Sequence, residues 1–566
     1  MPRNNRAPDL RLAPHDTRVR LPFAGLVSCL ALSCGLSALP ALAQNSQPNS
    51  QPLSSVDWLS RSVLQAPSMG VDPSTAPIAM LGTQGSRAVV EAPADEPPVA
   101  AAVGIDAVSI APIGAPMPSQ SLGLLPPART GLPLTLWGQT PEAELTQILR
   151  RERLDVMPAL QSLLFTLMLA ELDPPKNPSA TGVAPGQSLF LARIDRLIEL
   201  GALEPAHAML ELAGPSTPER FRRLFDISLL LGEEDDACDL MARSAAIAPS
   251  ITARIFCLAR GGDWPAAEVM FTSAQALGEL PKDVVPLIER FLDDAMIDSA
   301  EELTPPKDPT PLVFRMMEAI GQPMPTTYLP LAFAQADLRA NTGWKSRLEA
   351  AERLARAGTV DPNQMLGLYT EQSPAASGGI WERARAVASL DRAMQSRDPQ
   401  AVTLALEPAI SVMEEAELEV VLANLYGEAL ADIPLTGSAF DAAFRLGMLS
   451  PSYEIVAKAR KPRSQDEAML IGVAKGSTIG IRPLDSLGKA LKGAFDTAPH
   501  VPDAYRDLIE GDRLGEAILR AVDDITEGSR GGVKGVTDGL MMLRAAGLEN
   551  VARQTALQLT LLERRG

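Results

Sequence analysis

The chain is predicted to be all-α, a solenoid of paired helices that follows a proline-rich, extended or disordered arm. Three observations indicate this class. Only 4% of the 566 residues are aromatic, and a chain rich in Ala and Leu favours helices over β-sheets. Proline follows a capping residue at several expected helix starts. Glycines recur at a nearly constant spacing in the middle of the chain, which is typical of stacked repeats.

Residues 1–43 are predicted to be a signal peptide that is cleaved after export. A basic segment up to Arg20 precedes an uncharged apolar run, which ends in the small-x-small sequence Ala41-Leu42-Ala43. The run also has the length of a transmembrane helix, so a retained anchor is the alternative. The sequence before Cys29 resembles a lipobox, and lipidation there is a third, minor alternative. We expect the mature chain in the periplasm, without a further membrane span.

Residues 44–138 are predicted to form the arm. Fourteen prolines between Gln44 and Thr135 leave no room for long helices and favour extended chain. Two islands differ, Val56–Leu59 and Leu124–Trp137, because each has a tryptophan among apolar residues. Each island either docks onto the folded part or serves as a short motif for a partner.

Residues 139–465 are predicted to be the helical repeat domain, and residues 466–566 a further helical region. A side chain that can cap a helix is followed by proline at the first helical position, where no N–H donor is needed. These helix starts are Thr140-Pro141, Thr217-Pro218, Asp361-Pro362, Asp398-Pro399 and Ser450-Pro451.

The repeat is defined by glycines and the residues that follow them. Gly201, Gly232 and Gly262 are separated by 31 and 30 residues. Five residues after each comes an alanine, and nine after comes a large apolar residue. These positions are Ala206, Ala237 and Ala267, then Leu210, Met241 and Phe271. Glycine lets one helix stop and the next begin, and alanine permits close helix approach, so stacked helix pairs are expected.

These offsets resemble the second half of a tetratricopeptide repeat, and the closest copy is Gly262-Asp263-Trp264-Pro265-Ala266-Ala267. The resemblance covers about residues 190–280. It departs from the family in its shorter period and in lacking the aromatic residues expected in the first helix. The whole chain also resembles uncharacterised secreted proteins of α-proteobacteria. The resemblance implies a tetratricopeptide-like superhelix that binds a protein or peptide partner.

Cys238 and Cys257 remain in the chain once residues 1–43 are removed. An even pair in an oxidising compartment predicts a disulfide. The expected turn near Ala248-Pro249 would bring the two cysteines to the same level of an antiparallel helix pair. Two buried free thiols are the alternative.

The net charge of −18 excludes nucleic acid as an expected partner, because phosphates would be repelled. The carboxylate runs Glu233–Asp236 and Glu414–Glu415 are interpreted as solvated helix starts, where negative charge is favoured. His207 and His500 are far apart in the sequence, and His207 is expected to pack on a repeat helix. We therefore expect no metal site and no cofactor.

Enzyme motifs are weak. Ser486-Leu487-Gly488-Lys489 matches the S-x-x-K pattern of penicillin-recognising enzymes, but its companion motifs are missing. The glycine-rich segment Gly528–Gly535 lacks the ending of a phosphate-binding loop, and an inter-helix loop is expected there. No catalytic residue is assigned.

The sequence therefore predicts a non-enzymatic periplasmic scaffold that holds a protein or peptide partner. Two alternatives stay open. One is a cell-wall-processing factor, a lytic-transglycosylase-like enzyme or accessory protein, for which Glu510 or Glu516 would be the catalytic candidates. The other is a component of an envelope or motor machine.

Overall fold

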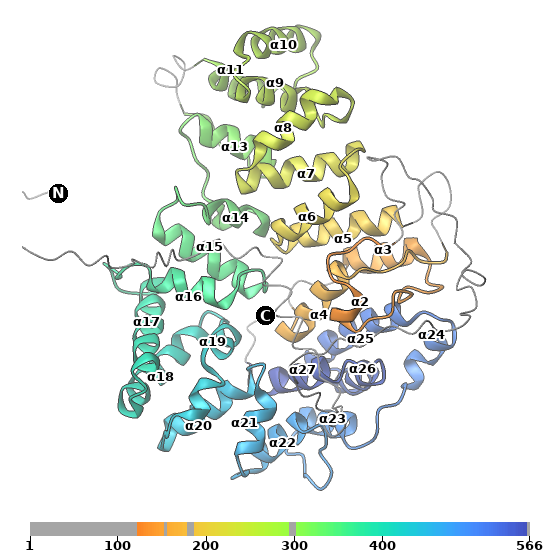
Figure 1. The fold of residues 1–566 in the computed structure, drawn as a ribbon, viewed down its shortest axis with the longest axis vertical. Coiled ribbons are helices and arrows are strands. Elements are labelled where there is room, and N and C mark those ends of the chain that lie inside the picture. The colour runs from red at the N-terminus through yellow and green to blue at the C-terminus, as the bar shows by residue number, and fades with distance from the viewer. Residues whose placement is uncertain (1–120, 152–155, 178–185, 294–301, 563–566) are drawn as a thin grey trace, which may run out of the picture. The chain divides into compact units, whose positions relative to one another are not determined.

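The computed structural model describes residues 121–151, 156–177, 186–293 and 302–562 (Figure 1). The predicted signal peptide with Cys29, most of the predicted arm and its first tryptophan island lie outside this part. Among the described residues the secondary structure is helical and no β-strand forms. Two isolated bridges pair Leu125 with Ala170 and Pro141 with Asn177. The predicted all-α class is confirmed for these residues.

The helices contact mainly their neighbours along the chain, as in the pairs α9/α10, α17/α18 and α25/α26. The helices of the first half are α2 Pro127–Thr130, α3 Glu142–Arg151, α4 Pro158–Leu169, α5 Gln187–Glu199, α6 Leu203–Ala213, α7 Pro218–Leu231, α8 Glu234–Arg243, α9 Ile251–Arg260, α10 Trp264–Leu277 and α11 Val285–Leu292.

The second half continues the same pattern of consecutive packing. Its helices are α13 Pro311–Ala319, α14 Ala334–Asp337, α15 Trp344–Arg356, α16 Pro362–Thr370, α17 Ile380–Ser396, α18 Pro399–Glu414, α19 Glu419–Tyr426, α20 Gly437–Met448, α21 Tyr453–Ala459, α22 Gln465–Ala474, α23 Ser486–Phe495, α24 Arg506–Glu510, α25 Leu514–Ser529, α26 Val533–Ala545 and α27 Glu549–Leu561.

Three of the five predicted helix starts form as expected. Thr217, Asp361 and Asp398 each precede a proline that is the first residue of α7, α16 or α18, and each side chain accepts a backbone N–H of the first turn. These contacts satisfy donors that have no partner within the helix.

The starts predicted at Thr140 and Ser450 are wrong in detail. The Ser450 hydroxyl donates to the Gly447 carbonyl and so closes the end of α20, while α21 begins later, at Tyr453. Pro141 pairs with Asn177, α3 begins at Glu142, and the buried Thr140 hydroxyl has no hydrogen-bond partner among the described residues. The long-range pairing with Asn177 competes with the predicted start at Pro141, whereas at Ser450 the preceding helix takes the hydroxyl.

The hydrophobic core brings together parts of the chain that are far apart in the sequence. One cluster of buried side chains contains residues from Leu125 to Ala336 and again from Phe444 to Leu557. A second cluster lies mainly between Ala334 and Leu449. The first cluster spans residues on both sides of position 466, so the C-terminal helices share a core with those that begin the described chain.

The island Leu124–Trp137 docks into that core, which is the first of the two alternatives considered for it. Leu125, Leu136 and Trp137 are each 1% exposed. The Trp137 ring lies against α25, where a Cβ placed on Gly515 would come within 2.5 Å of the indole. The backbone N–H of Gln139 also donates to the Asp512 carbonyl, at 2.8 Å. The docked island therefore joins the first helices to the last.

Candidate partner-binding site

The turns at Gly201, Gly232 and Gly262 have the same backbone conformation. Their φ angles are +75°, +82° and +84°, and they follow α5, α7 and α9. This left-handed region is unfavourable for residues with a Cβ, so glycine ends each of these helices at little cost. The aligned glycines thus perform the same local task in three consecutive helix pairs.

The residues that follow the glycines are also equivalent in burial. The three alanines at the fifth position and the three large apolar residues at the ninth are all buried in the second helix of each pair. They are Ala206, Ala237 and Ala267, with Leu210, Met241 and Phe271. The spacing seen in the sequence therefore corresponds to buried positions in α6, α8 and α10.

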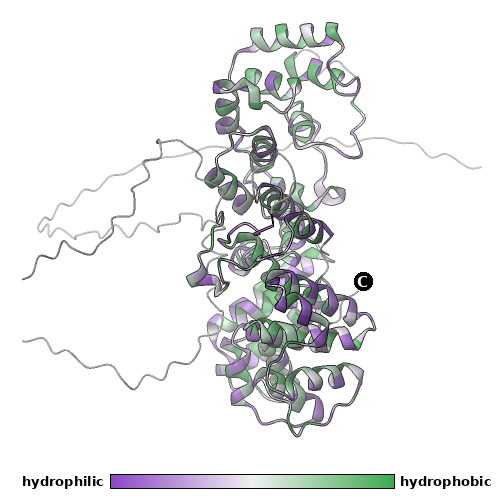
Figure 2. Cartoon of the chain, turned by 90° about the vertical axis from the view of Figure 1, so that its right-hand side faces the viewer, coloured by the Kyte–Doolittle hydropathy of each residue, from purple (hydrophilic) through white to green (hydrophobic). Residues whose placement is uncertain are grey.

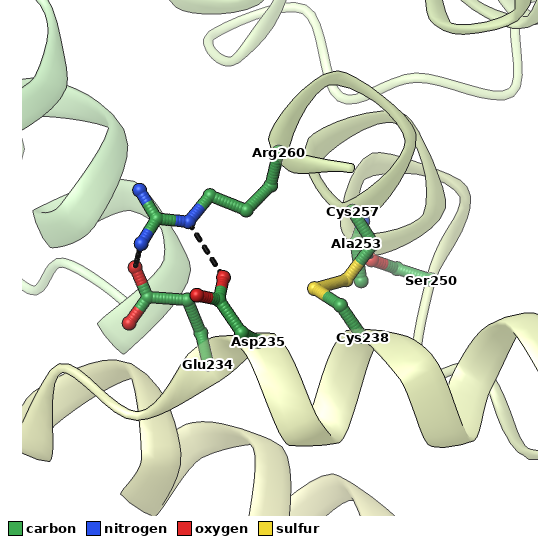
Figure 3. The surroundings of a disulfide bond; sticks show 7 residues. All are labelled: Glu234, Asp235, Cys238, Ser250, Ala253, Cys257 and Arg260. Atoms are coloured by element: carbon green, nitrogen blue, oxygen red, sulfur yellow. Dashed lines mark hydrogen bonds and ion pairs between the residues drawn. A yellow bond between two sulfur atoms is a disulfide. The ribbon is translucent and has the colours of Figure 1, made fainter. Parts of the chain in front are cut away.

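Cys238 on α8 and Cys257 on α9 form a disulfide, with their Cα atoms 5.1 Å apart (Figure 3). The two helices belong to successive pairs, as the sequence predicted. Ser250 starts α9, and its hydroxyl accepts the backbone N–H of Ala253 at 3.0 Å. The cap sets where α9 begins, and the cross-link holds α9 against α8.

Ion pairs join the same helices at the start of α8. Arg260 donates to Asp235 at 2.8 Å and lies 3.5 Å from Glu234 (Figure 3). Glu234 is 1% exposed and also accepts from Arg315 of α13 at 2.7 Å. The interpretation of this acidic run as a solvated helix start is therefore wrong for Glu234, because α13 covers it and provides its counter-charge.

The ionic network continues from α13 toward α14. Arg315 also pairs with Glu318 on its own helix, and Glu318 accepts from Arg339 at 2.9 Å. Burial acts to raise the pKa of Glu318, but Arg339 and Arg315 outweigh it and hold that pKa below its ordinary value. Glu318 is therefore ionised at neutral pH and ties α13 to the segment after α14.

A groove of about 450 Å³ opens beside the disulfide, between α8, α9 and the start of α10. Its lining combines apolar and charged side chains. The apolar part includes Met241, Leu258, Met270 and the two cysteines. Asp239 of α8 and Arg254 of α9 are exposed in the same groove. The groove also has Asp235, Asp263 and Arg260 in its lining, so it offers apolar contact together with three acidic and two basic side chains.

Helix α10 has more apolar residues than one face can bury. Ala267, Phe271 and Ala274 form its buried stripe, whereas Val269 and Leu277 are 65% and 72% exposed. Leu277 lies seven residues after the groove residue Met270, so it is on the same face of α10, about 10 Å further along the helix. In Figure 2, hydrophobic residues occupy much of this helix, the uppermost one. This exposed apolar surface was not predicted, although the apolar positions of α10 outside its core stripe were a usable signal in the sequence.

The other motifs lie apart from the groove. Ser486 and Lys489 are exposed at the start of α23, where Asp485 caps the helix. In the segment Gly528–Gly535, only Arg530–Gly532 connect α25 to α26, and the other residues belong to the ends of the two helices, so the expected inter-helix loop is shorter than predicted.

Neither histidine joins a metal-binding cluster among the described residues. His207 lies 3.6 Å from Glu211 on its own helix. His500 is exposed beside the Ala498 carbonyl. Glu414 and Glu415 are at the end of α18 rather than at a helix start, so their interpretation as a start is wrong.

The two candidate catalytic glutamates differ in their surroundings. Glu516 on α25 is fully buried and pairs with Arg520 at 2.7 Å and with Arg513. Arg513 and Arg520 also bind Glu144 of α3, so Glu516 belongs to a network that joins the two ends of the described chain. Glu510 is exposed at the end of α24.

Comparisons with protein-family models, curated proteins and solved structures gave no match to this chain. Over the described residues, none of the helices has the length and apolarity needed to span a membrane. The observations that bear on function are therefore the helix pairs, the disulfide and the groove beside it.

Proposed function

We propose that the chain is a non-enzymatic periplasmic scaffold of tetratricopeptide-like repeats that binds a protein or peptide partner in the groove between α8, α9 and α10. The observation that carries this proposal is the groove of about 450 Å³, together with the exposed side chain of Leu277 two helical turns beyond the groove residue Met270 on α10. Exposed apolar side chains beside a concave surface are typical of sites that another chain covers.

Two further observations support the proposal. The equivalent glycine turns and buried alanines in α5–α10 fit the arrangement of a helical repeat array, whose surfaces commonly bind extended or helical segments. The disulfide Cys238–Cys257 fits an oxidising compartment such as the periplasm. The partner segment would place an apolar side chain against Met270 and Leu258 and polar groups near Asp239 and Arg254.

Site-specific photo-crosslinking tests the proposal. A photoreactive amino acid replaces Leu277, or Leu404 as the control, which is equally exposed but lies on α18. The mature chain is then irradiated in a periplasmic extract of an α-proteobacterium, and the adducts are identified by mass spectrometry. We expect one recurring protein adduct from position 277 and none from position 404.

A blocking variant gives the second readout. Ala242 is exposed and lines the groove, so Ala242→Trp should fill it and abolish the adduct while the helical content is unchanged. Leu404→Trp is the matched control and should leave the adduct intact. Equal adducts from both crosslinking positions, or an adduct that survives Ala242→Trp, would contradict the proposal.

A further inference from the structure

The loop of residues 475–485, between α22 and α23, exposes two large apolar side chains. Ile479 is 74% exposed and Leu484 is 65% exposed. Figure 1 shows this part of the chain at the lower edge of the fold, next to α22 and α23. No residue of the loop lines the groove beside the disulfide, so a partner of the loop would be independent of the proposed partner site.

The backbone on both sides of Ile479 is held against the helices, which keeps the Ile479 side chain outside. Thr478 is fully buried, and its N–H donates to the Phe495 carbonyl of α23 at 3.4 Å. Ile481 donates its N–H to the Thr478 carbonyl at 3.0 Å. The Ile481 side chain lies so close to α22 that a Cβ placed on Gly472 would come within 2.5 Å of it. The folded loop therefore presents Ile479 to its surroundings.

Basic side chains accompany the two apolar ones. Lys475, Arg482 and Lys489 are exposed and form no ion pair within the described part of the chain. Asp485 is the acidic residue of this stretch, and its carboxylate accepts a backbone N–H of the first turn of α23 at 2.6 Å. From residue 453 to residue 495 the sequence has eight basic and four acidic residues, whereas the whole chain has a net charge of −18. This end of the fold is therefore locally cationic.

Most other charges of α21–α23 are paired with neighbouring charges. The pairs are Lys458 with Glu454, Arg460 and Arg463 with Asp441 and Glu467, and Lys492 with Asp496. The exposed Lys461 and Asp466 have no such partner among the described residues, and their charges are opposite. The excess of unpaired positive charge therefore comes from the loop and the first turn of α23.

An anionic lipid surface fits this combination better than an acidic protein segment. Lipid phosphates attract cations, and apolar side chains beside those cations enter the boundary between headgroups and acyl chains. Lipids pack around an exposed side chain, whereas a folded partner would need a matching hollow for each apolar side chain. The acidic remainder of the chain opposes the approach only weakly, because charges farther away than about 8 Å are screened at physiological salt.

We propose that the loop of residues 475–485 binds an anionic phospholipid surface. Ile479 and Leu484 would enter the boundary between headgroups and acyl chains, and Lys475, Arg482 and Lys489 would lie beside the phosphates. The acidic charge of the other faces would orient the chain, so that it meets the lipid with this loop.

The test measures co-sedimentation of the chain from Gln44 onward with lipid vesicles. The predicted signal peptide is left out because its apolar run would bind lipid by itself, and the described fold begins at residue 121. Vesicles of equal parts phosphatidylglycerol and phosphatidylcholine are compared with vesicles of phosphatidylcholine alone, at about 0.1 M salt. We expect saturable binding to the anionic vesicles and binding at least about tenfold weaker to the neutral ones.

Two double variants separate the apolar from the ionic contribution. Ile479→Ser with Leu484→Ser should weaken binding to the anionic vesicles about tenfold, because less apolar surface leaves water. Lys475→Gln with Lys489→Gln should weaken it about 25-fold, which is about fivefold for each charge.

The matched controls are Leu404→Ser and Lys282→Gln, which change exposed side chains elsewhere and should alter binding less than about twofold. Circular dichroism verifies that every variant is folded. Equal binding to both kinds of vesicle, or undiminished binding of the variant with two serines, would overturn the proposal. Tighter binding to soluble polyglutamate than to the anionic vesicles would overturn it in favour of an acidic protein segment.

Discussion

Asp226 on α7 shows how burial changes the chemistry of a single residue. Burial raises the pKa of its carboxyl to about 6, and Arg222 and Arg223 oppose this shift without cancelling it. The folded chain therefore holds the proton more tightly than the unfolded chain, whose ordinary value is 3.8. The stability linked to Asp226 is present below about pH 4 and is lost as the pH rises through about 6.

Asp226→Asn should remove this pH dependence, because asparagine does not ionise. Relative to the unsubstituted chain, the variant should gain about 1–2 kcal/mol in free energy of unfolding between about pH 4 and pH 7. Denaturant titrations at several pH values measure this difference. Asp236→Asn, at an exposed position of α8, is the control. An identical difference at every pH would contradict the expectation.

Arg193 is a second residue whose role depends on burial. It is 4% exposed, and its guanidinium donates to the carbonyls of Met168, Ala170 and Leu122 at 2.7–2.9 Å. Burial lowers its pKa to about 10, so it stays charged at neutral pH. One side chain thus closes the end of α4 and holds the segment that precedes α2.

Arg193→Met should leave three carbonyl groups without this donor and lower the free energy of unfolding by about 3–5 kcal/mol. Arg222→Met is the matched control, because the Arg222 side chain is 72% exposed, and it should cost less than about 0.5 kcal/mol. Equilibrium denaturation of both variants measures the contrast. Similar losses would show that the three carbonyl contacts contribute little.

At the scale of the helix, glycine has opposite effects in a turn and in a helix interior. Gly262 has φ near +84°, with open space around a Cβ placed there, so any penalty comes from the backbone alone. Gly367 lies exposed inside α16, also with open space around it. Alanine is unfavourable in the first conformation and favourable in the second.

Gly262→Ala should therefore destabilise the chain by about 1 kcal/mol, and Gly367→Ala should stabilise it by about 0.5–1 kcal/mol. Thermal unfolding of both variants gives the two signs directly. Two changes of the same sign would argue against a backbone origin of the effect.

The disulfide acts between elements, since it joins α8 to α9 across a sequence separation of 19 residues. Replacing both cysteines by serine should lower the free energy of unfolding of this helix pair by about 3 kcal/mol, because the unfolded chain gains conformational entropy when it is no longer cross-linked. Hydrogen exchange should show faster opening of α8 and α9 and little change in α26.

The bridge itself can be tested in the unsubstituted chain. Thiol titration under denaturing, non-reducing conditions should find no free thiol at Cys238 or Cys257, and a count of two free thiols would disprove the bridge.

At the scale of the whole described fold, stability depends on the contact between its first and last helices. Ala159 of α4 donates its N–H to the Gln558 side chain of α27 at 2.8 Å. Glu144 of α3 binds Arg513 at 2.6 Å and Arg520 at 3.1 Å. The Trp137 ring packs directly against Gly515 of α25. Unfolding of these two ends should therefore be coupled.

Trp137→Ala should cost about 3–5 kcal/mol, because it opens a large cavity in this core. Hydrogen exchange should accelerate together in α3, α4, α25 and α27, whereas α9 and α10 should keep their protection. Acceleration confined to α3 would contradict the coupling. Leu134→Ala, at a position 39% exposed in the same segment, is the control and should have little effect.

Features that depend on neighbours close in the sequence could be predicted. The caps at Thr217 and Asp361, the turns at Gly201 and Gly262, and the pairing of Cys238 with Cys257 all act within about twenty residues. The predicted start at Ser450 failed because that hydroxyl closes the preceding helix instead. A local motif cannot indicate which of two adjacent helices will take the side chain.

The helical class and the order of helix pairs follow from local physical chemistry, namely capping, helix propensity and the glycine turns, which any segment carries with it. The covered Glu234, the core that unites Trp137 with α25, and a cavity of about 510 Å³ lined by α4, α25 and α27 arise from contacts between residues separated by 81 to about 400 positions. No local pattern encodes such contacts, because the residues meet only after the many helices between them in the sequence have packed. The tertiary structure therefore decides which distant residues meet, and with them the groove beside the disulfide and the cavity between the first and last helices.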